Sequence, residues 1–316
     1  MVKMIYQRIF LGLLTLVLVS VIVFGVIETL PGDPCTAYLG RMAQGTRLEN
    51  CRQEFGLDRP ALTRYVDWAT NILKGDFGIS LKRKKPVFDV ILPRLRNTAL
   101  LGLSATMLGV PIAIFLGVIS GLWRDRKLDL WVSTGAIFAM TVPEFVTATL
   151  MILFFSVWLD WLPGIVTTRP DAPIMEFLSG IILPVISLSL VMAAHILRMV
   201  RTTVIEVMTS DFIQMACLKG VPYWRMVFYH VLPSALLPTI NLVAMTIAWL
   251  LGGVVVIEVV FNYPGLGRLM VNAVSDRDLT MVQSIALILA GIYVALNLFA
   301  DLLVLVANPR LRTMRT

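Results

Sequence analysis

Residues 9–27, IFLGLLTLVLVSVIVFGVI, contain no charged side chain. An α-helix needs roughly 20 predominantly apolar residues to cross the hydrocarbon core of a bilayer. Because backbone polar groups cannot remain unpaired in lipid, a run of this kind is expected to be helical. The stretch therefore predicts a membrane-spanning helix close to the start of the chain.

Comparable apolar runs recur along the rest of the sequence, and together they predict six spanning helices. The third run is interrupted by Glu144, and the fourth contains His195. The five later runs are Asn97–Trp123, Leu130–Leu159, Phe177–Leu197, Val231–Ile257 and Leu279–Ala300. Gly117 and Gly121 in the second run form a small-xxx-small pattern, which favours close helix packing within the bundle over a dimer seam. We predict an all-α polytopic membrane protein.

The composition excludes several other classes of protein. Of the 316 residues, 58% are hydrophobic and 15% are charged, and the mean hydropathy is +0.83. Soluble domains are typically about half apolar and about a quarter charged. So few charges could not cover a water-facing surface of this size, which argues against a soluble enzyme, a disordered chain and a fibrous protein.

The positions of the basic side chains predict the orientation, because cytoplasmic loops carry an excess of Lys and Arg. With the N-terminus inside, the two short outside loops contain only Arg169, Arg268 and Arg277. The inside segments contain Lys3, Arg8, Arg124, Arg126, Lys127, Arg198, Arg201, Lys219, Arg225, Arg310, Arg312 and Arg315. This bias predicts both termini in the cytoplasm. The net charge of +7 therefore reports topology, and no nucleic-acid partner is predicted.

A long segment after the first span is predicted to lie outside. It holds twelve basic and seven acidic residues, but long loops are translocated largely regardless of charge. We read its basic run, Lys82–Lys85, as a solvated face in preference to an anion site. Apolar residues at three- and four-residue spacing predict an amphipathic helix on the membrane surface or the outer mouth of the bundle. They are Leu62, Tyr65, Val66, Ala69, Ile72 and Leu73, followed by Gly75.

The cysteines and short motifs indicate no catalytic, metal-binding or nucleotide-binding site in this chain. Cys35 and Cys51 lie in the predicted oxidising compartment, where a disulfide and two free thiols are both open possibilities, and Cys217 is expected to be a free cytoplasmic thiol. Neither a metal-binding spacing nor a phosphate-binding loop occurs. We therefore predict no catalytic residue, no metal site and no cofactor bound by this chain. Any nucleotide would bind to another subunit.

The loop between the fourth and fifth spans predicts a short helix–turn–helix. Phe212, Met215 and Ala216 fall on one helical face, Gly220 can end that helix in a left-handed conformation, and Pro222 can start the next one. A second apolar face is formed by Met226, Val227 and Tyr229. Apolar residues on a basic cytoplasmic surface favour a docking site for a partner. The alternative is an amphipathic helix among lipid headgroups.

This loop resembles the EAA loop of ABC importer permeases. The resemblance rests on Gln214-Met215-Ala216, then Gly220, and on Leu232-Pro233 further along. Matches to the dipeptide and oligopeptide branch extend from residue 30 to residue 309: Leu30–Pro34, Gly56–Pro60, Gly75–Ser80, Asp211-Phe212, Lys219-Gly220, Pro233–Pro238, Glu258, Phe261, Pro264–Gly267 and Asn308-Pro309. The sequence departs from the family at Gln214, where an acid is usual, at Met215, where alanine is usual, and at Cys217, where arginine is usual.

The resemblance implies a type I permease fold in a bacterial inner membrane, with a coupling helix that docks on an ATPase subunit. The implied coupling residues are Asp211, Phe212, Gln214, Met215, Ala216, Lys219, Gly220 and Pro222. The implied partners are a second, homologous permease, two ATPases that hold ATP and magnesium, an external solute-binding protein and membrane lipid. The implied division is a first membrane helix (1–30), a periplasmic segment (31–97), a five-helix core (98–309) with the coupling loop 198–234, and a cytoplasmic tail (310–316).

Polar residues within or beside spans are candidates for the translocation path, since charges in the membrane are costly. Glu144 could meet a substrate amine or form a helix-packing pair, and the sequence favours neither. Asn297 and Asp301, one turn apart, favour a structural pair, whereas Glu258 could order the turn after the fifth span.

Two questions about transport stay open at this stage. A secondary transporter or channel without ATPases is the alternative to the importer, and a membrane-embedded enzyme lacks any catalytic constellation. Peptides are the expected substrates, with glutathione, nickel or another small solute as alternatives.

Overall fold

The computed structural model describes residues 2–29 and 32–307. Five helices in this part are long and apolar enough to cross a membrane. They lie in α1 (Val2–Thr29), α5 (Val87–Leu122), α9 (Ile182–Met208), the segment from α11 (Tyr223–Met226) into α12 (Leu232–Val260), and α14 (Leu279–Ala307). Asn308-Pro309 and the predicted tail 310–316 lie outside the described residues, as do Leu30 and Pro31 of the predicted turn. The predicted helical membrane fold is confirmed.

The predicted third span is not one helix. It consists of α6 (Lys127–Thr141) and of α7 (Glu144–Met151) with the π-helix η2 (Ile152–Trp158), and the two parts are bent by 105°. Val142 between them is extended, at φ −77° and ψ 126°. The cause is Pro143, which cannot donate a backbone hydrogen bond and disfavours a helical conformation in the residue before it. Residues 2–29 and 32–307 therefore contain five helices that could span a membrane, or six if the bent pair counts as one.

Two other predicted boundaries also shift. The second helix begins at Val87, ten residues before Asn97, and it contains Pro93 and Pro111. The fourth begins at Ile182 and continues to Met208. Phe177, its predicted start, lies in the separate short helix α8 (Ile174–Phe177).

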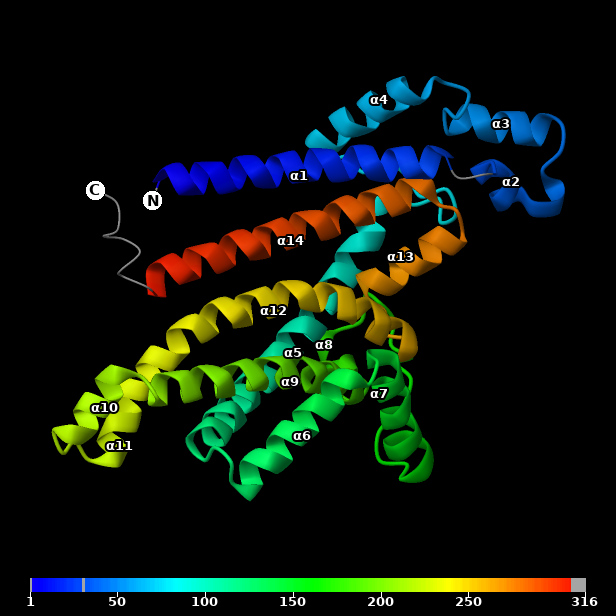
Figure 1. Cartoon of the computed structure of the whole chain (residues 1–316). Helices are drawn as coiled ribbons and strands as arrows, with labels where there is room; N and C mark the ends of the chain where they lie inside the picture. The colour runs from blue at the N-terminus through cyan, green and yellow to red at the C-terminus, as the bar shows by residue number, and fades with distance from the viewer. Residues whose placement is uncertain (1, 30–31, 308–316) are drawn as a thin grey trace.

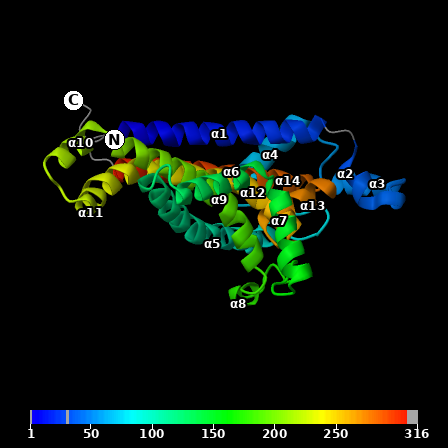
Figure 2. The ribbon, with the colours of Figure 1, turned by 60° about the horizontal axis from the view of Figure 1, so that its bottom comes forward.

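Short elements gather at the two ends of the bundle (Figures 1 and 2). At one end lie α10 (Asp211–Leu218) and α11, and this is also the end where α1 starts and α14 finishes. At the other end lie α2 (Pro34–Leu39), η1 (Gly40–Met42), α3 (Thr46–Glu54) and α13 (Leu266–Ser275). The second end is where the sequence predicts the outer segment.

The tightest helix pair is α5 with α9. Small residues recur every four positions on α5, and a Cβ added at Gly117 would lie 2.8 Å from the Leu197 carbonyl oxygen. At Gly121 it would lie 2.8 Å from the Val204 Cβ. Side chains at these positions would therefore push the helices apart, and the predicted small-xxx-small packing within the bundle is confirmed.

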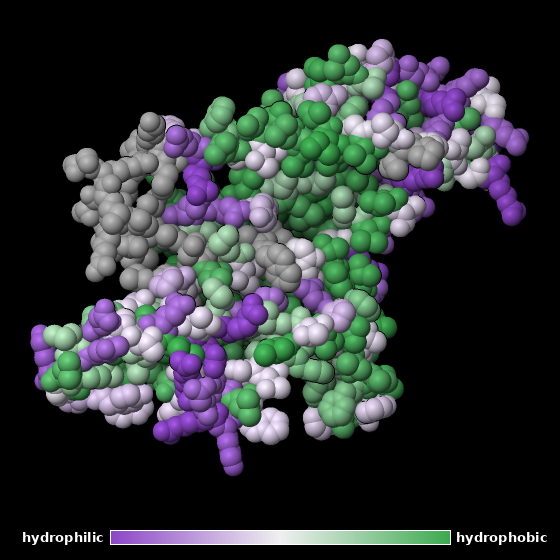
Figure 3. All heavy atoms as spheres, viewed as in Figure 1, coloured by the Kyte–Doolittle hydropathy of each residue, from purple (hydrophilic) through white to green (hydrophobic). Residues whose placement is uncertain are grey.

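The predicted amphipathic helix is α4 (Ala61–Leu73), which packs along α1. The Tyr65 ring lies 5.3 Å from that of Phe24, and its hydroxyl is 2.8 Å from the Ser20 hydroxyl. Leu62 and Leu73 of α4 remain exposed. In Figure 3 the surface over α1 and α4 is broadly hydrophobic up to the hydrophilic outer end, as expected of a lipid-facing side.

Candidate functional site

The loop between α9 and α12 folds into the predicted helix–turn–helix. Gly220 has φ +75°, the left-handed conformation that favours glycine, and its N–H bonds to the Cys217 carbonyl at 2.9 Å. Pro222 precedes α11, and its carbonyl accepts the Met226 N–H at 2.9 Å. No atom lies within 4 Å of a Cβ added at Gly220, so the constraint there is the backbone angle and not crowding. We name residues 211–231 the knob.

The knob is anchored by buried apolar residues. Ile213, Met226, Val227 and Val231 are 1%, 3%, 1% and 0% exposed. Ile213 lies in the same cluster as the inward side chains of α9. Sequence reasoning missed this anchor and placed Met226 and Val227 on an outer face, because a four-residue helix has too few turns to distinguish its two sides by periodicity.

A set of large apolar side chains remains uncovered on the knob. Phe212 and Met215 are about half exposed, and neighbouring rings of Trp224 and Phe228 stack with centroids 6.0 Å apart. The whole exposed set is Phe212, Met215, Leu218, Tyr223, Trp224, Phe228 and Tyr229. Such a patch next to charged residues is typical of a protein interaction site.

Polar residues of the knob support its fold. The Gln214 side-chain amide donates to the Thr209 carbonyl at 3.1 Å, which satisfies an acceptor at the end of α9. A carboxylate could not donate this bond, so the departure from an acid at position 214 has a local structural role. Asp211 in the first turn and Lys219 at the end of α10 both match the helix dipole. Ala216 is half-buried between these exposed positions.

Glu144, the first residue of α7, is half-buried against α12. A Cβ added at Gly253 would lie 2.7 Å from its Oε2 atom, so the carboxylate packs directly on that backbone. His195 of α9 is near enough for an electrostatic interaction with it. Glu144 thus lies between α7, α9 and α12.

Glu258, in contrast, belongs to a buried network at the outer end. Its two carboxylate oxygens accept the Thr98 hydroxyl at 2.6 Å and the Arg268 N–H at 2.9 Å. The Thr98 oxygen accepts the Leu266 N–H at 2.8 Å, and a Cβ at Gly265 would lie 2.0 Å from Glu258 Oε1. Glu258 therefore orders the turn before α13, and its carboxylate caps the N-terminus of α13.

Asn97 extends this network to a further loop, and sequence reasoning missed it. The side-chain amide of Asn97 donates to the backbone carbonyls of Pro170 and Pro264 at 2.9 and 3.1 Å. The backbone carbonyl of Asn97 accepts the Tyr263 hydroxyl at 2.9 Å. Tyr263 is fully buried, and desolvation raises the pKa of its hydroxyl above the ordinary value. The outer loops are thus joined through the hydrogen bonds of Asn97 and Tyr263.

Asn297 and Asp301 do not form the expected pair. The Asn297 amide donates to the Tyr293 carbonyl of its own helix at 3.0 Å. Asp301 instead forms an ion pair with Arg8 of α1 at 3.2 Å. The structure brings neither of them together with Glu144 or Glu258. The expected pair was wrong because sequence spacing does not report which neighbouring helix a polar side chain faces.

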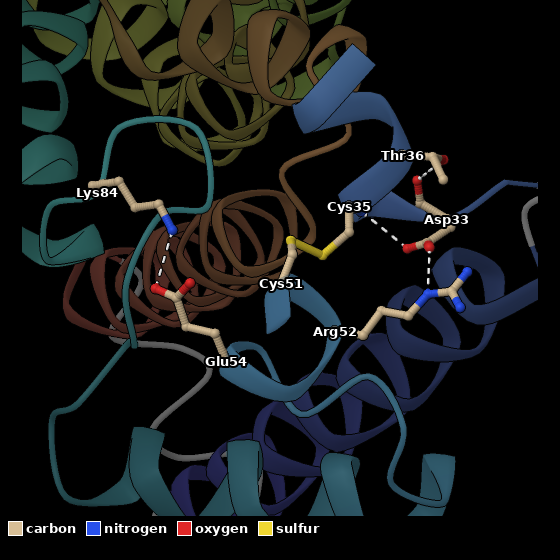
Figure 4. Close-up of a disulfide and its surroundings, with 7 residues drawn as sticks. All are labelled: Asp33, Cys35, Thr36, Cys51, Arg52, Glu54 and Lys84. Atoms are coloured by element: carbon tan, nitrogen blue, oxygen red, sulfur yellow. Dashed lines mark hydrogen bonds and ion pairs between the residues drawn. A yellow bond between two sulfur atoms is a disulfide. The ribbon is translucent and has the colours of Figure 1, made fainter. Parts of the chain in front are cut away.

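Cys35 and Cys51 form a disulfide that joins α2 to α3 (Figure 4). We name residues 32–58 the cap. Lys84, from the basic run, reaches across to the cap, where it pairs with Glu54 at 3.1 Å and lies over the Phe55 ring at 4.5 Å. All four residues of the basic run, Lys82–Lys85, are exposed, as expected of a solvated face, and Lys84 makes this contact at the surface. Cys217 is a free, exposed thiol.

The loop that carries Lys84 is held in turn by a buried carboxylate. Asp278 is 2% exposed, and it accepts the Ser80 hydroxyl and the backbone N–H groups of Leu81 and Lys82, both at 3.3 Å. Lys82 also pairs with Asp276 at 3.4 Å. The cap is therefore connected through this loop to the junction of α13 and α14.

Comparison with known proteins places this architecture. A family model described as binding-protein-dependent transport system inner membrane component matches residues 109–313, and the model for the N-terminal part of such components matches residues 1–102. The chain belongs to this permease family. It is a permease subunit of an ABC importer, and such permeases generally work with a partner permease, ATPases and a binding protein.

Relatives of the permease span its whole length. A protein named as a peptide ABC transporter permease in Sinorhizobium fredii is 32% identical over 98% of both chains. A protein named as a peptide transport system permease in Brucella abortus is 35% identical over 99% of both. The glutathione transport system permease protein GsiC of Escherichia coli K12 is 35% identical over 96% of both.

The fold of the permease also matches a solved structure. An amino acid ABC transporter with histidines superposes with a TM-score of 0.53 at 16% identity, over 68% of this chain and 92% of the other.

Among the residues that the structure describes, no group of three or more His, Cys, Asp or Glu side chains could hold a metal ion.

Proposed function

We propose that this permease imports peptides and that the knob couples it to an ATPase subunit in the cytoplasm. The observation that carries the coupling role is the exposed aromatic and methionine patch, which is held on the buried anchor of Ile213 and Met226. Docking of such a patch buries apolar area, and the anchor passes the movement of the partner on to the membrane helices. The cap then lies on the periplasmic side, toward the binding protein, as the basic-residue bias also indicates.

The docking role is tested by placing a charge in the patch. Met215→Asp would put a carboxylate at an apolar contact, and the matched control, Met42→Asp, changes an exposed methionine on the cap. We expect Met215→Asp to reduce co-purification of ATP-binding subunits at least tenfold, with membrane insertion retained. Met42→Asp should leave that co-purification unchanged. Equal recovery of ATPases with Met215→Asp would contradict the proposal.

The turn of the knob offers a second test. Gly220→Val forces a β-branched residue to φ +75°, where L-residues are strained by roughly 1–2 kcal/mol. We expect ATP-dependent uptake to be lost while the chain still inserts. Normal uptake would show that the shape of this turn is not needed for coupling.

The peptide class follows from relatives named for peptides and for glutathione, itself a tripeptide. The test is ATP-dependent uptake of a labelled dipeptide by proteoliposomes with the complete transporter. Unlabelled peptides should compete, and nickel ions should not. If nickel ions reduced the uptake and unlabelled peptides did not, the peptide class would be contradicted and a metal ion would be the proposed substrate.

Among the four polar candidates, we propose Glu144 for the translocation path. Glu258, Asn297 and Asp301 form hydrogen bonds or an ion pair within the chain. Glu144 faces His195 and packs against the Gly253 backbone at the break of a helix. A carboxylate there could pair with the amine of a peptide. We expect Glu144→Gln to reduce uptake of a free-amine dipeptide about tenfold and to leave its N-acetylated form unaffected. An equal effect on both would assign Glu144 to helix packing.

A further inference from the structure

One buried ion pair lies outside every role described so far. Asp129, near the start of α6, is 2% exposed. Its two carboxylate oxygens accept hydrogen bonds from Nε and Nη2 of Arg201 in α9, at 2.6 and 2.7 Å. Two parallel bonds of this kind constrain orientation as well as distance. Sequence reasoning counted Arg201 only as a cytoplasmic positive charge and did not single out Asp129.

The same carboxylate joins further elements. Ser120 of α5 donates its hydroxyl to Asp129, the backbone N–H of Asp125 in the α5–α6 turn donates at 2.9 Å, and Ser133 of α6 donates at 3.1 Å. Asp125 has φ +64°, so the turn is held in a left-handed conformation as it reaches the carboxylate. One side chain therefore fastens α5, α6 and α9 together at a single level.

This level is next to the knob. Arg201 lies seven residues before the end of α9 at Met208, which is about 10 Å at the helical rise per residue. Beyond it, Gln214 bonds to the Thr209 carbonyl and Ile213 is buried. Because α5 and α9 are also in backbone contact at Gly117 and Gly121, a displacement of the knob cannot move α9 alone.

The second helix that leaves the knob is built differently. It starts with the π-helix η3 (Val227–Val231), and Pro238 lies inside α12. Both features interrupt regular hydrogen bonding and allow bending. Movement of the knob is thus transmitted stiffly through α9, while α12 can absorb it.

We propose that the Asp129–Arg201 pair is a positioning pair for coupling, which makes α5, α6 and α9 one rigid block that moves with the knob. Neither residue touches substrate or nucleotide in this scheme. The inference rests on the proposed coupling role of the knob. It concerns how the movement is divided among the helices and not whether the ATPase docks.

The test uses the complete transporter in proteoliposomes and measures solute imported per ATP hydrolysed. Asp129→Asn keeps the shape and removes the charge, and we expect at least a tenfold fall in this ratio with ATPase docking retained. Arg201→Lys keeps the charge but loses the fork, and a partial fall is expected. Thr202→Ala, which removes an exposed hydroxyl that bonds only to the Arg198 carbonyl within α9, is the control and should keep the normal ratio. A normal ratio in assembled Asp129→Asn overturns the inference.

A second measurement leaves Asp129 and Arg201 in place. Spin labels attached after Leu130→Cys in α6 and Met199→Cys in α9, both at exposed positions, report the distance within the block. Cys217→Ser removes the exposed native thiol that would also react. With the ion pair intact we expect this distance to be the same with and without ATP, and a nucleotide-dependent shift overturns the inference. Absence of ATP-driven uptake by the wild-type transporter would instead contradict the proposed function itself, so the two failures are distinguishable.

Discussion

At the cap end of the bundle, polar side chains are buried and paired, whereas at the knob end large apolar side chains are exposed. Glu258 and Asp278 are 0% and 2% exposed and have several donors each. Leu218 on the knob, in contrast, is 81% exposed. Buried, satisfied networks favour one fixed arrangement of their elements. An uncovered apolar patch is complete only in contact with a partner.

The difference teaches that the two ends should respond differently to substitution. Changes at the cap end should affect the stability of the chain, because its contacts are internal. Changes in the exposed apolar patch of the knob should affect assembly and coupling. Changes in the anchor beneath it, and in the polar bonds that hold the knob on α9, should affect stability. The predictions below break or sharpen this contrast, starting with the largest expected effect.

The largest effect is expected for Gly265→Val. The new Cβ would lie 2.0 Å from Glu258 Oε1, so the buried carboxylate would lose its place beside the turn. Breaking a buried charged network by one partner typically costs about 3–5 kcal/mol. We expect little folded protein, measured as the monodisperse fraction after detergent extraction. Gly252→Val in α12, where a Cβ meets no atom within 4 Å, is the control, and equal yields of both variants would contradict the prediction.

Removal of the disulfide should have a smaller effect that is confined to the cap. A cross-link with a sequence separation of 16 residues stabilises by about 3 kcal/mol in the chain-entropy model. In the double variant Cys35→Ala, Cys51→Ala we expect faster proteolysis within residues 32–58, with the thermal unfolding temperature of the bundle nearly unchanged. Cys217→Ser is the matched control and should alter neither. A large loss of bundle stability would show that the cap is part of the main core.

On the knob, Ile213→Val should loosen the anchor. Ile213 is 1% exposed, and removal of one buried methylene typically costs about 1 kcal/mol. The thiol of Cys217, whose sulfur lies 3.3 Å from that of Met226, reports this change. We expect Cys217 to react several-fold faster with a maleimide in Ile213→Val, and at the normal rate in Phe212→Leu, which alters an exposed neighbour. Equal rates would show that Ile213 does not anchor the knob.

The sequence predicts those parts of this architecture that depend on local pattern. Apolar runs predict the helices, Gly117 and Gly121 predict close packing, and Gly220 with Pro222 predicts the turn of the knob. Each of these features depends on residues within about one or two helical turns of one another. Val142-Pro143 is visible in the sequence as a helix break in the third span, but the angle of 105° depends on packing against α9 and α12.

Long-range polar partners are the part that sequence reasoning could not predict. Asp129 and Arg201 are 72 residues apart, Thr98 and Glu258 are 160 apart, and Ser80 and Asp278 are 198 apart. Nothing in a single sequence reports which charged or hydroxyl group faces which across helices. The same limit explains why Asp301 was expected beside Asn297, although it pairs with Arg8.

The smallest effect is expected for Gln214→Glu, which restores the acid usual in the EAA loop. The carboxylate cannot donate to the Thr209 carbonyl, so the end of α9 loses one bond and its acceptor turns to water. A typical intramolecular hydrogen bond contributes about 0.5–1.5 kcal/mol, and at this exposed position we expect the low end of that range. Thermal unfolding of the purified chain should shift down slightly, and co-purification of ATP-binding subunits should remain. Gln53→Glu on the exposed surface of the cap is the matched control and should not shift unfolding. Loss of the ATPases with Gln214→Glu would mean that the amide itself contacts the partner, and the knob surface would then extend to position 214.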